Sequence, residues 1–283
     1  MKKLILFFLL TASIFAQGEL LLLMSGGYNN TETTKYLAGQ TVSGVQATRI
    51  DNFVSSLKDS LGITALSSKF DVMYLLANQN AALALRNLVK RSHDATAVNS
   101  PTFTAWEGFL SAATKYLNTN YTPKTDGVAY TLNSASYGLY SRTDASSSYA
   151  SMGSNSVTDS ASAYFYARLT TTHYGNINQD GSTGRTAGTV ANSLGLLVQT
   201  RTASNATHYY QNAVLIDDGT ATSTVLPALP FYITTRNDNG SPNGATLRQI
   251  AFAFTGATLS ATEVRKLFNC LEVYLIEIGA SVL

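Results

Sequence analysis

Beyond residue 97 the chain consists of short β-forming segments separated by groups of turn-forming residues. Turn groups such as Asp126-Gly127 and Asp180-Gly181 supply residues that tolerate tight backbone reversals. Strand and helix patterns do not alternate after residue 90, which disfavours a parallel α/β sheet. The spacing therefore predicts an all-β sandwich of two sheets, with strands at 102–106, 114–118, 130–142, 161–171, 193–202, 207–216, 229–236 and 248–255.

Two amphipathic helices are expected to flank this β region. One is predicted over 47–61, ended by Gly62, because apolar residues recur at helical spacing at Ile50, Phe53, Val54, Leu57 and Leu61. The other is predicted over 260–278, where Ser260 and Glu263 form a capping box. Its apolar stripe must pack against the first helix or against the outer face of a sheet, and it consists of Val264, Leu267, Phe268, Leu271, Leu275 and Ile278.

Two further elements are expected between the first helix and the β region. The run FDVMYLLA, residues 70–77, is compact and apolar and predicts a strand, with a buried helix as the alternative. Residues 80–89 predict a short helix rich in Ala and Leu.

The N-terminus has the three parts of a secretory signal peptide over residues 1–16. Lys2 and Lys3 precede the apolar core 4–10, and Ala16 offers a cleavage point. The alternative interpretation is a buried or interfacial arm, which the second apolar run Leu20–Met24 favours. Residues 17–46 then predict a linker or extended arm, and 47–283 a helix-flanked β-sandwich domain.

Charge and cysteine content limit the classes of partner and of cross-link. Removal of Lys2 and Lys3 with the signal leaves 17 basic against 17 acidic residues, so no basic patch for nucleic acid is expected. Cys270 is the single cysteine, which excludes an internal disulfide, and we expect it to be semi-buried in the C-terminal helix. Three predicted strands end in Arg142, Arg201 or Arg236, which are expected to keep their charge in water.

The acidic residues do not form a pattern for glycoside hydrolysis, which requires two carboxyl groups on either side of one bond. Glu107 is the only glutamate between Thr33 and Thr262, and most aspartates stand in turn contexts. His93, His173 and His208 accompany no nucleophile motif. The sequence therefore predicts a protein that is not an enzyme, with a glycoside-active enzyme that uses Glu107 as the disfavoured alternative.

Residues 176–182 place oxygen-bearing side chains at alternate positions before a glycine, as at the start of a calcium loop. The candidate ligands are Asn176, Asn178 and Asp180, but the twelfth position, where a calcium loop has Glu, is Ala187. A hairpin turn is the favoured interpretation. We accordingly expect no cofactor, with calcium as the alternative.

Aromatic residues among Asn, Thr and Ser are the remaining indication of function. Exposed Tyr and Trp stack on sugar rings and neighbouring polar groups bond their hydroxyls, although Tyr is also ordinary strand material. The glycan-binding candidates are Trp106, Tyr121, Tyr174, Asn176 and Tyr209.

The closing segment LRQIAFAFTGATLSATEVRKLFNCLEVYLIEIG resembles the last strand and helix of laminin-G-like modules in the concanavalin A-like lectin/glucanase superfamily. Further segments are similar to a sandwich module common in bacteriophage structural and tail proteins: LLLLMSGG (20–27), RIDNFVSSLKDSLG (49–62), KFDVMYLLANQNAALALRNL (69–88), AVNSPTFTAWEGF (97–109) and KYLNTNYTP (115–123). The resemblance covers residues 20–283. It implies a jelly-roll sandwich flanked by helices, with no catalytic residues.

These observations predict a non-enzymatic structural or adhesion protein, a tail or capsid-associated component of a bacteriophage particle, that presents a lectin-like surface. The alternative is a secreted bacterial carbohydrate-binding protein. Expected partners are other virion or cell-surface proteins, glycans, or further copies of the chain. The expected location is the virion or the extracellular space.

Overall fold

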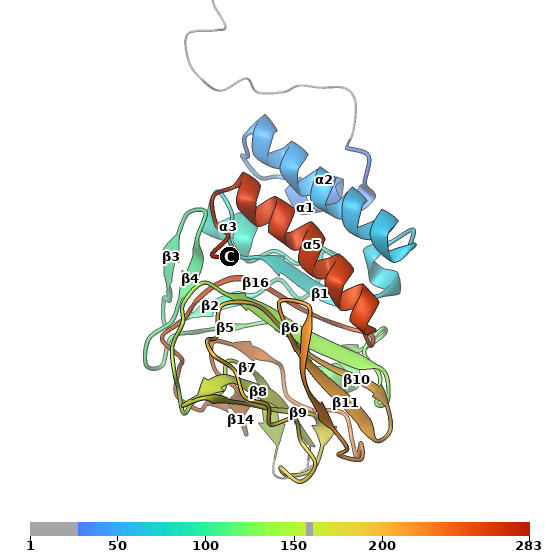
Figure 1. The fold of residues 1–283 in the computed structure, drawn as a ribbon. Coiled ribbons are helices and arrows are strands. Elements are labelled where there is room, and N and C mark those ends of the chain that lie inside the picture. The colour runs from blue at the N-terminus through green and yellow to red at the C-terminus, as the bar shows by residue number, and fades with distance from the viewer. Residues whose placement is uncertain (1–27, 157–160) are drawn as a thin grey trace, which may run out of the picture.

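The computed structural model describes residues 28–156 and 161–283, which form two stacked β-sheets and a layer of helices over one of them (Figure 1). The predicted all-β sandwich with flanking helices is confirmed. The predicted signal peptide and the apolar run Leu20–Met24 lie outside the described residues. No helix in the described part of the chain is long and apolar enough to cross a membrane.

The first sheet lies in the middle of the molecule, beneath the helices (Figure 1). Its order is β12-β11-β10-β6-β16, all antiparallel, after which β16 pairs with both β1 and β4, and β4 pairs with β3. The strands are β1 (Phe70–Leu75), β3 (Thr102–Thr104), β4 (Gly108–Leu110), β6 (Ala135–Ser141), β10 (Gly195–Ala203), β11 (Ala206–Gln211), β12 (Val214–Gly219) and β16 (Gln249–Gly256).

The second sheet forms the opposite side of the sandwich. Strands β9, β8 and β7 are neighbours in that order. On one branch β7 pairs with β13, which continues to β5 and β2. On the other branch β7 pairs in parallel with β14, which continues to β15. The strands are β2 (Thr96–Val98), β5 (Tyr116–Asn118), β7 (Met152–Ser156), β8 (Ala161–Leu169), β9 (Thr172–Gln179), β13 (Tyr232–Ile233), β14 (Asn237–Asp238) and β15 (Ser241–Pro242).

The helices α2 (Gly44–Leu61) and α5 (Ala261–Glu277) pack against each other on the outer face of the first sheet (Figure 1). Ser260 and Glu263 form the predicted capping box, and Gly62 ends α2 with a left-handed backbone, φ 68°. Shorter helices are α1 (Thr31–Leu37), α3 (Ala81–Ala84), α4 (Pro123–Asp126) and the 3₁₀ helix Leu66–Ser68. The helix predicted over 80–89 is therefore only a single turn.

The segment predicted as a linker is packed on the domain in its described part. Tyr36 of α1 is fully buried and its hydroxyl donates to the Leu83 carbonyl oxygen at 2.7 Å. Glu32 accepts from the backbone N–H of Leu66 at 3.0 Å and pairs with Lys58 at 3.3 Å. These specific contacts are made by residues far apart in the sequence, which local composition does not reveal.

The first sheet is buried on both faces, so two hydrophobic layers share its strands. Leu196 and Val198 of β10 pack with the helices, whereas Leu197 faces the second sheet. All six residues of β1 are buried. A strand covered on both sides has a continuous apolar run, which explains why residues 70–77 were compatible with either strand or buried helix.

Two of the predicted boundaries are wrong because a turn begins at a residue other than the one expected. The single strand predicted over 207–216 is a hairpin of β11 and β12, in which Asn212 and Ala213 adopt positive φ of 51° and 64°. Alanine is rare in that conformation. The turn expected over 176–182 begins later, because residues 176–179 belong to β9.

Candidate functional site

Three tyrosines stand together on the outer face of the second sheet, on the opposite side of the molecule from the helices. On β8, Ala163 and Phe165 point into the core, so Tyr164 and Tyr166 between them point outward. Tyr174 on β9 is paired directly with Tyr166. The rings of Tyr164 and Tyr166 meet edge to face with centroids 5.8 Å apart. All three side chains are partly exposed.

Two arginines lie over these rings. The Arg236 guanidinium is 4.5 Å from the centroid of Tyr164, and that of Arg185 is 4.3 Å from the centroid of Tyr174. We call the surface formed by Tyr164, Tyr166, Tyr174, Arg185 and Arg236 the Tyr/Arg face. It combines apolar ring faces with nitrogen donors on a rigid sheet.

Hydrogen bonds hold Arg236 in place. One Nη donates to the Tyr166 hydroxyl at 3.1 Å and the other donates to Asp238 at 2.8 Å. Asp238 in turn accepts from the side-chain amides of Asn155 at 3.0 Å and Asn243 at 2.8 Å. The guanidinium is therefore positioned before any ligand arrives, which lowers the entropy lost on binding.

The charge states on this face are fixed near neutral pH. Burial lowers the pKa of Arg236, but the hydrogen bond to Asp238 and the nearby tyrosines outweigh it, so the pKa lies above its ordinary value. Burial raises the pKa of Asp238, and the hydrogen bonds from Asn155 and Arg236 more than reverse that shift. Burial also raises the pKa of Tyr164, which keeps its hydroxyl protonated. The face thus offers the neutral hydroxyl of Tyr164 beside the ion pair of Arg236 and Asp238.

Two further tyrosines, Tyr232 and Tyr116, lie across the same sheet from Tyr164. Tyr232 on β13 pairs with Asn118 on one side and with Gly153 on the other, and Gly153 pairs with Tyr164. The ring of Tyr232 lies 4.3 Å from that of Tyr116. Gly153 has φ 123°, and a Cβ there would lie 2.0 Å from the Ala163 carbonyl oxygen, so a side chain is sterically excluded.

Of the five predicted glycan candidates, Tyr174 lies on the Tyr/Arg face and three are buried. The Tyr121 hydroxyl donates to Asp71 at 2.8 Å in the core, and Tyr209 stacks on His173 with ring centroids 3.2 Å apart. Asn176 is on the same sheet, but only 1% of it is exposed and its amide donates to Ser162 and to the Gly181 carbonyl oxygen. Tyr121, Tyr209 and Asn176 therefore have structural roles, contrary to the expectation.

The remaining candidate, Trp106, lies away from this face. It is in the turn between β3 and β4 at the edge of the first sheet, where its backbone N–H donates to the Asn78 carbonyl oxygen at 2.9 Å. Glu107, the carboxylate considered for glycoside chemistry, lies beside it and pairs with Arg142 at 3.3 Å. The fold therefore does not bring these two residues to the tyrosines.

Asn176 and Asn178, two of the three calcium ligands suggested by the sequence, make side-chain hydrogen bonds within the protein. The Asn178 side-chain oxygen accepts from the Tyr130 hydroxyl at 2.7 Å, and its amide donates to the carbonyl oxygens of Thr131 and Leu132. Asp180 is exposed beyond the end of β9. Within residues 28–156 and 161–283 no group of three or more His, Cys, Asp or Glu is placed to hold a metal ion.

Thr202, His208 and Asp218 are hydrogen-bonded in the hydroxyl–imidazole–carboxylate order of a catalytic triad. His208 contacts Thr202 Oγ1 through Nε2 at 3.0 Å and Asp218 through Nδ1 at 2.5 Å. The acid of a catalytic relay is buried, whereas the Asp218 side chain is 61% exposed. We interpret the row as polar cross-strand contacts on the surface of β10, β11 and β12.

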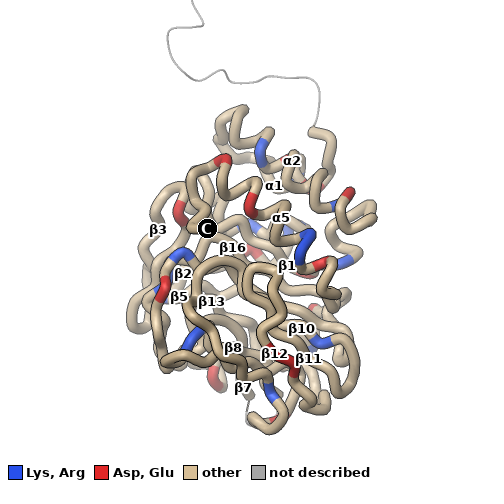
Figure 2. Tube along the Cα trace, in the orientation of Figure 1, with Lys and Arg blue, Asp and Glu red and all other residues tan. Residues whose placement is uncertain are grey.

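Charged residues of both signs lie interspersed along the described trace (Figure 2). Of the three strand-end arginines, Arg201 contradicts the prediction of a solvated charge. It is fully buried, and its guanidinium donates to the carbonyl oxygens of Ile177, Ala203, Ser204 and Ala221. Arg201 thereby ties the first sheet to β9 of the second.

Comparisons with known proteins give matches only at the level of structure. No family model and no curated protein matches the sequence. Among solved structures, Trypanosoma rangeli sialidase in complex with 2,3-difluorosialic acid matches with a TM-score of 0.53 and 12% identity, over 81% of this chain and 39% of that chain. The same sialidase in complex with sialic acid gives a TM-score of 0.50 and 12% identity, over 80% and 39%.

A smaller module also matches, at lower similarity. The Ruminococcus gnavus IT-sialidase CBM40 bound to alpha2,3 sialyllactose has a TM-score of 0.42 and 11% identity, over 57% of this chain and 96% of that chain. The chain spans about two fifths of the length of the T. rangeli sialidase. At these identities the likeness to that sialidase indicates a shared β-sandwich fold and nothing about the residues of a site.

Proposed function

We propose that this chain is a non-enzymatic adhesion module that contacts carbohydrate through the Tyr/Arg face. The observation that carries the proposal is the cluster of Tyr164, Tyr166 and Tyr174 with Arg236 and Arg185 held over their rings. It stands on the outer face of the second sheet, opposite the helical layer.

The chemistry of the face suits a sugar. A guanidinium covers one face of the Tyr164 ring and one face of the Tyr174 ring, and the parts of the three rings that stay exposed supply apolar area for the C–H face of a pyranose. Tyrosine also has few rotatable bonds to order on binding. The tyrosine hydroxyls and the guanidinium groups beside these rings are hydrogen-bonding groups for the sugar hydroxyls, while the Asn155 and Asn243 amides hold Asp238. The sialidase neighbours, described in complex with sialic acid, support this proposal only as a fold-level analogy.

A non-catalytic role is part of the proposal. Asp238, the carboxylate that contacts Arg236, already accepts from three side-chain amides and one guanidinium, and its pKa is lowered. A general acid in glycoside hydrolysis needs a raised pKa and a second carboxylate across the scissile bond. Asp238 is therefore suited to hold Arg236 rather than to transfer a proton.

We place this module in a bacteriophage particle, as a tail or capsid-associated protein, because of the segment resemblance over residues 20–283. The signal-like N-terminus favours instead an exported bacterial carbohydrate-binding protein. Mass spectrometry of purified particles separates the two: peptides of this chain support the virion location, and recovery only as a free monomer in culture medium contradicts it.

The glycan proposal is tested with the purified chain on a glycan array, followed by titration of the best ligand. Tyr174→Ala is expected to weaken binding about tenfold, because it removes one stacking surface worth about 1.4 kcal/mol. Tyr28→Ala is the matched control, since Tyr28 is 40% exposed at the start of the helical layer and far from the second sheet. The proposal is wrong if the wild-type chain binds no glycan, or if Tyr174→Ala binds as tightly as the control.

A further inference from the structure

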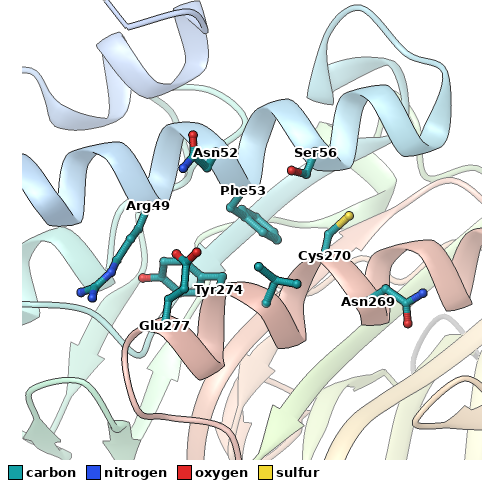
Figure 3. A pocket seen from close by; sticks show the side chains of 9 residues that line it. Arg49, Asn52, Phe53, Ser56, Asn269, Cys270, Tyr274 and Glu277 are labelled. Carbon is teal, nitrogen blue, oxygen red and sulfur yellow. The ribbon is translucent and has the colours of Figure 1, made fainter.

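A groove runs between α2 and α5 on the solvent side of the helical layer (Figure 3). Its apolar lining comes from Phe53 of α2 and from Cys270, Val273 and Tyr274 of α5. The polar residue Arg49 lies near one end of the groove, with Cys270 toward the other (Figure 3). The groove is on the opposite side of the molecule from the Tyr/Arg face and is independent of the function proposed for that face.

The rim of the groove carries large apolar side chains that no described residue covers. Val273 is 59% exposed and Ile276 of the same helix is 65% exposed. Val45 of α2, 62% exposed, precedes Arg49 by four residues and so lies on the groove side of its helix. Helices of a folded domain normally turn such residues toward a partner, so this face indicates a missing apolar occupant.

The chain itself contains a segment of matching chemistry. Leu20–Met24 is a run of five apolar residues that is separate from the core of the predicted signal at residues 4–10. Cleavage after Ala16 would leave this run near the start of the mature protein. Five large apolar side chains in water are unfavourable, whereas burial of each contributes to stability.

The point where the described chain begins places this segment within reach. The backbone N–H groups of Asn29 and Asn30 donate to the Asp51 carboxylate of α2 at 3.1 and 3.2 Å. Leu20 precedes Tyr28 by eight residues, which span up to about 26 Å when extended. A helix is about 10–12 Å wide with its side chains, so the chain can cross α2 and reach the groove.

We propose that Leu20–Met24 binds in the groove between α2 and α5 of its own chain and covers Val273 and Cys270. We call Leu20–Met24 in this role the strap. Cys270 is the single cysteine, lines the groove and is 9% exposed, so a second cysteine placed on the segment can be joined to it only where the two come close.

The test is disulfide trapping in the full chain. Leu21→Cys and Leu22→Cys each introduce a second cysteine, on opposite sides of an extended segment, and mild oxidation joins two cysteines only when their Cα atoms approach within about 7 Å. We expect one of the two variants to form an intrachain disulfide with Cys270, seen as an oxidised monomer by non-reducing electrophoresis and mass spectrometry. Val128→Cys is the control, because Val128 is 73% exposed and does not line the groove.

The products of oxidation show whether the groove holds the N-terminal segment of the same chain or a second copy of the chain. A disulfide-linked dimer with no oxidised monomer would show that a second copy fills the groove and would overturn the intramolecular proposal. Two free thiols in both variants would also overturn it. Thiol labelling gives an independent measurement without an added cysteine: Leu22→Asp, with an unchanged circular dichroism spectrum, should label at Cys270 at least fivefold faster than wild type, and an unchanged rate would contradict the strap.

Discussion

His173 lies at the interface of the two sheets and makes the stability of the fold sensitive to acid. Its ring is fully buried and stacks on Tyr209 of the first sheet with an interplanar angle of 6°. Nε2 is 3.1 Å from Thr186 Oγ1, and Nδ1 is buried without a partner among the described residues. Burial lowers the pKa of this imidazole from 6.5 to about 3, and Arg185 adds to that shift against smaller opposing hydrogen bonds.

The direction of the effect follows from the two pKa values. Because the folded pKa lies below the unfolded one, the unfolded chain takes up a proton first, and acid favours unfolding between pH 6.5 and about 3. Each pH unit in this window corresponds to about 1.4 kcal/mol. His173 therefore lowers the free energy of unfolding by about 2 kcal/mol at pH 5 relative to pH 7.5, and has little effect above 6.5.

We predict that His173→Gln removes this part of the pH dependence, because glutamine stays neutral and still offers a polar group to Thr186. Urea unfolding at pH 7.5, 6.5 and 5, followed by tryptophan fluorescence, gives the free energy of unfolding for both proteins. The difference between wild type and variant should shift by about 2 kcal/mol in favour of the variant between pH 7.5 and 5. All other titrating groups are shared and cancel. Parallel pH profiles for the two proteins would refute the reasoning.

Two further substitutions test the packing. Arg201→Met should lower the free energy of unfolding, measured in urea, by about 3 kcal/mol, because it leaves the buried carbonyl oxygens of Ile177 and Ala221 without donors. The control Arg91→Met breaks a surface ion pair and should change the free energy of unfolding by less than about 1 kcal/mol. Equal losses in the two variants would contradict the structural role of Arg201. Ser260→Ala should cost about 1 kcal/mol by removing the α5 cap, and Ser260→Asp should restore it; an unchanged melting temperature for the alanine variant would show that the cap is dispensable.

Elements encoded by local periodicity were predictable. The capping box at Ser260 and the apolar stripe after it locate α5 to within one residue at each end. The strand predicted at 248–255 is observed at Gln249–Gly256 for the same reason. These segments carry their own start and stop signals, so tertiary contacts are not needed to recognise them.

Elements that depend on distant partners could not be predicted in the same way. The burial of Arg201 arises from carbonyl oxygens on β9 and on the chain after β12, which its neighbours in sequence do not reveal. Likewise α1 is held by Asp51 and Lys58 of α2, through hydrogen bonds spanning more than twenty residues. Polar residues that satisfy buried partners look like surface residues in a sequence.

Part of the candidate site could have been predicted from the sequence. Tyr164 and Tyr166, two residues apart on a predicted strand, share a face by the period of a β-strand, and this signal could have ranked them above Tyr121 and Tyr209. Which face is covered depends on where the helices pack. Arg236 was noticed only as a strand-end charge, because its position over Tyr164 requires the pairing of β14 with β7.

The two outer sides of the sandwich differ because the first sheet has apolar residues on both of its faces and the second sheet on its inner face alone. The first sheet has apolar residues on both faces, and the outer set, including Leu196, Val198 and Phe254, requires the cover that α2 and α5 provide. The outer face of the second sheet carries Tyr, Asn and Arg instead, which are stable in contact with water. A sheet with one polar aromatic face needs no helical layer, so that face stays in contact with solvent and is the one we propose for glycan binding. The exposed apolar side chains of α2 and α5 are the surface that we propose Leu20–Met24 covers.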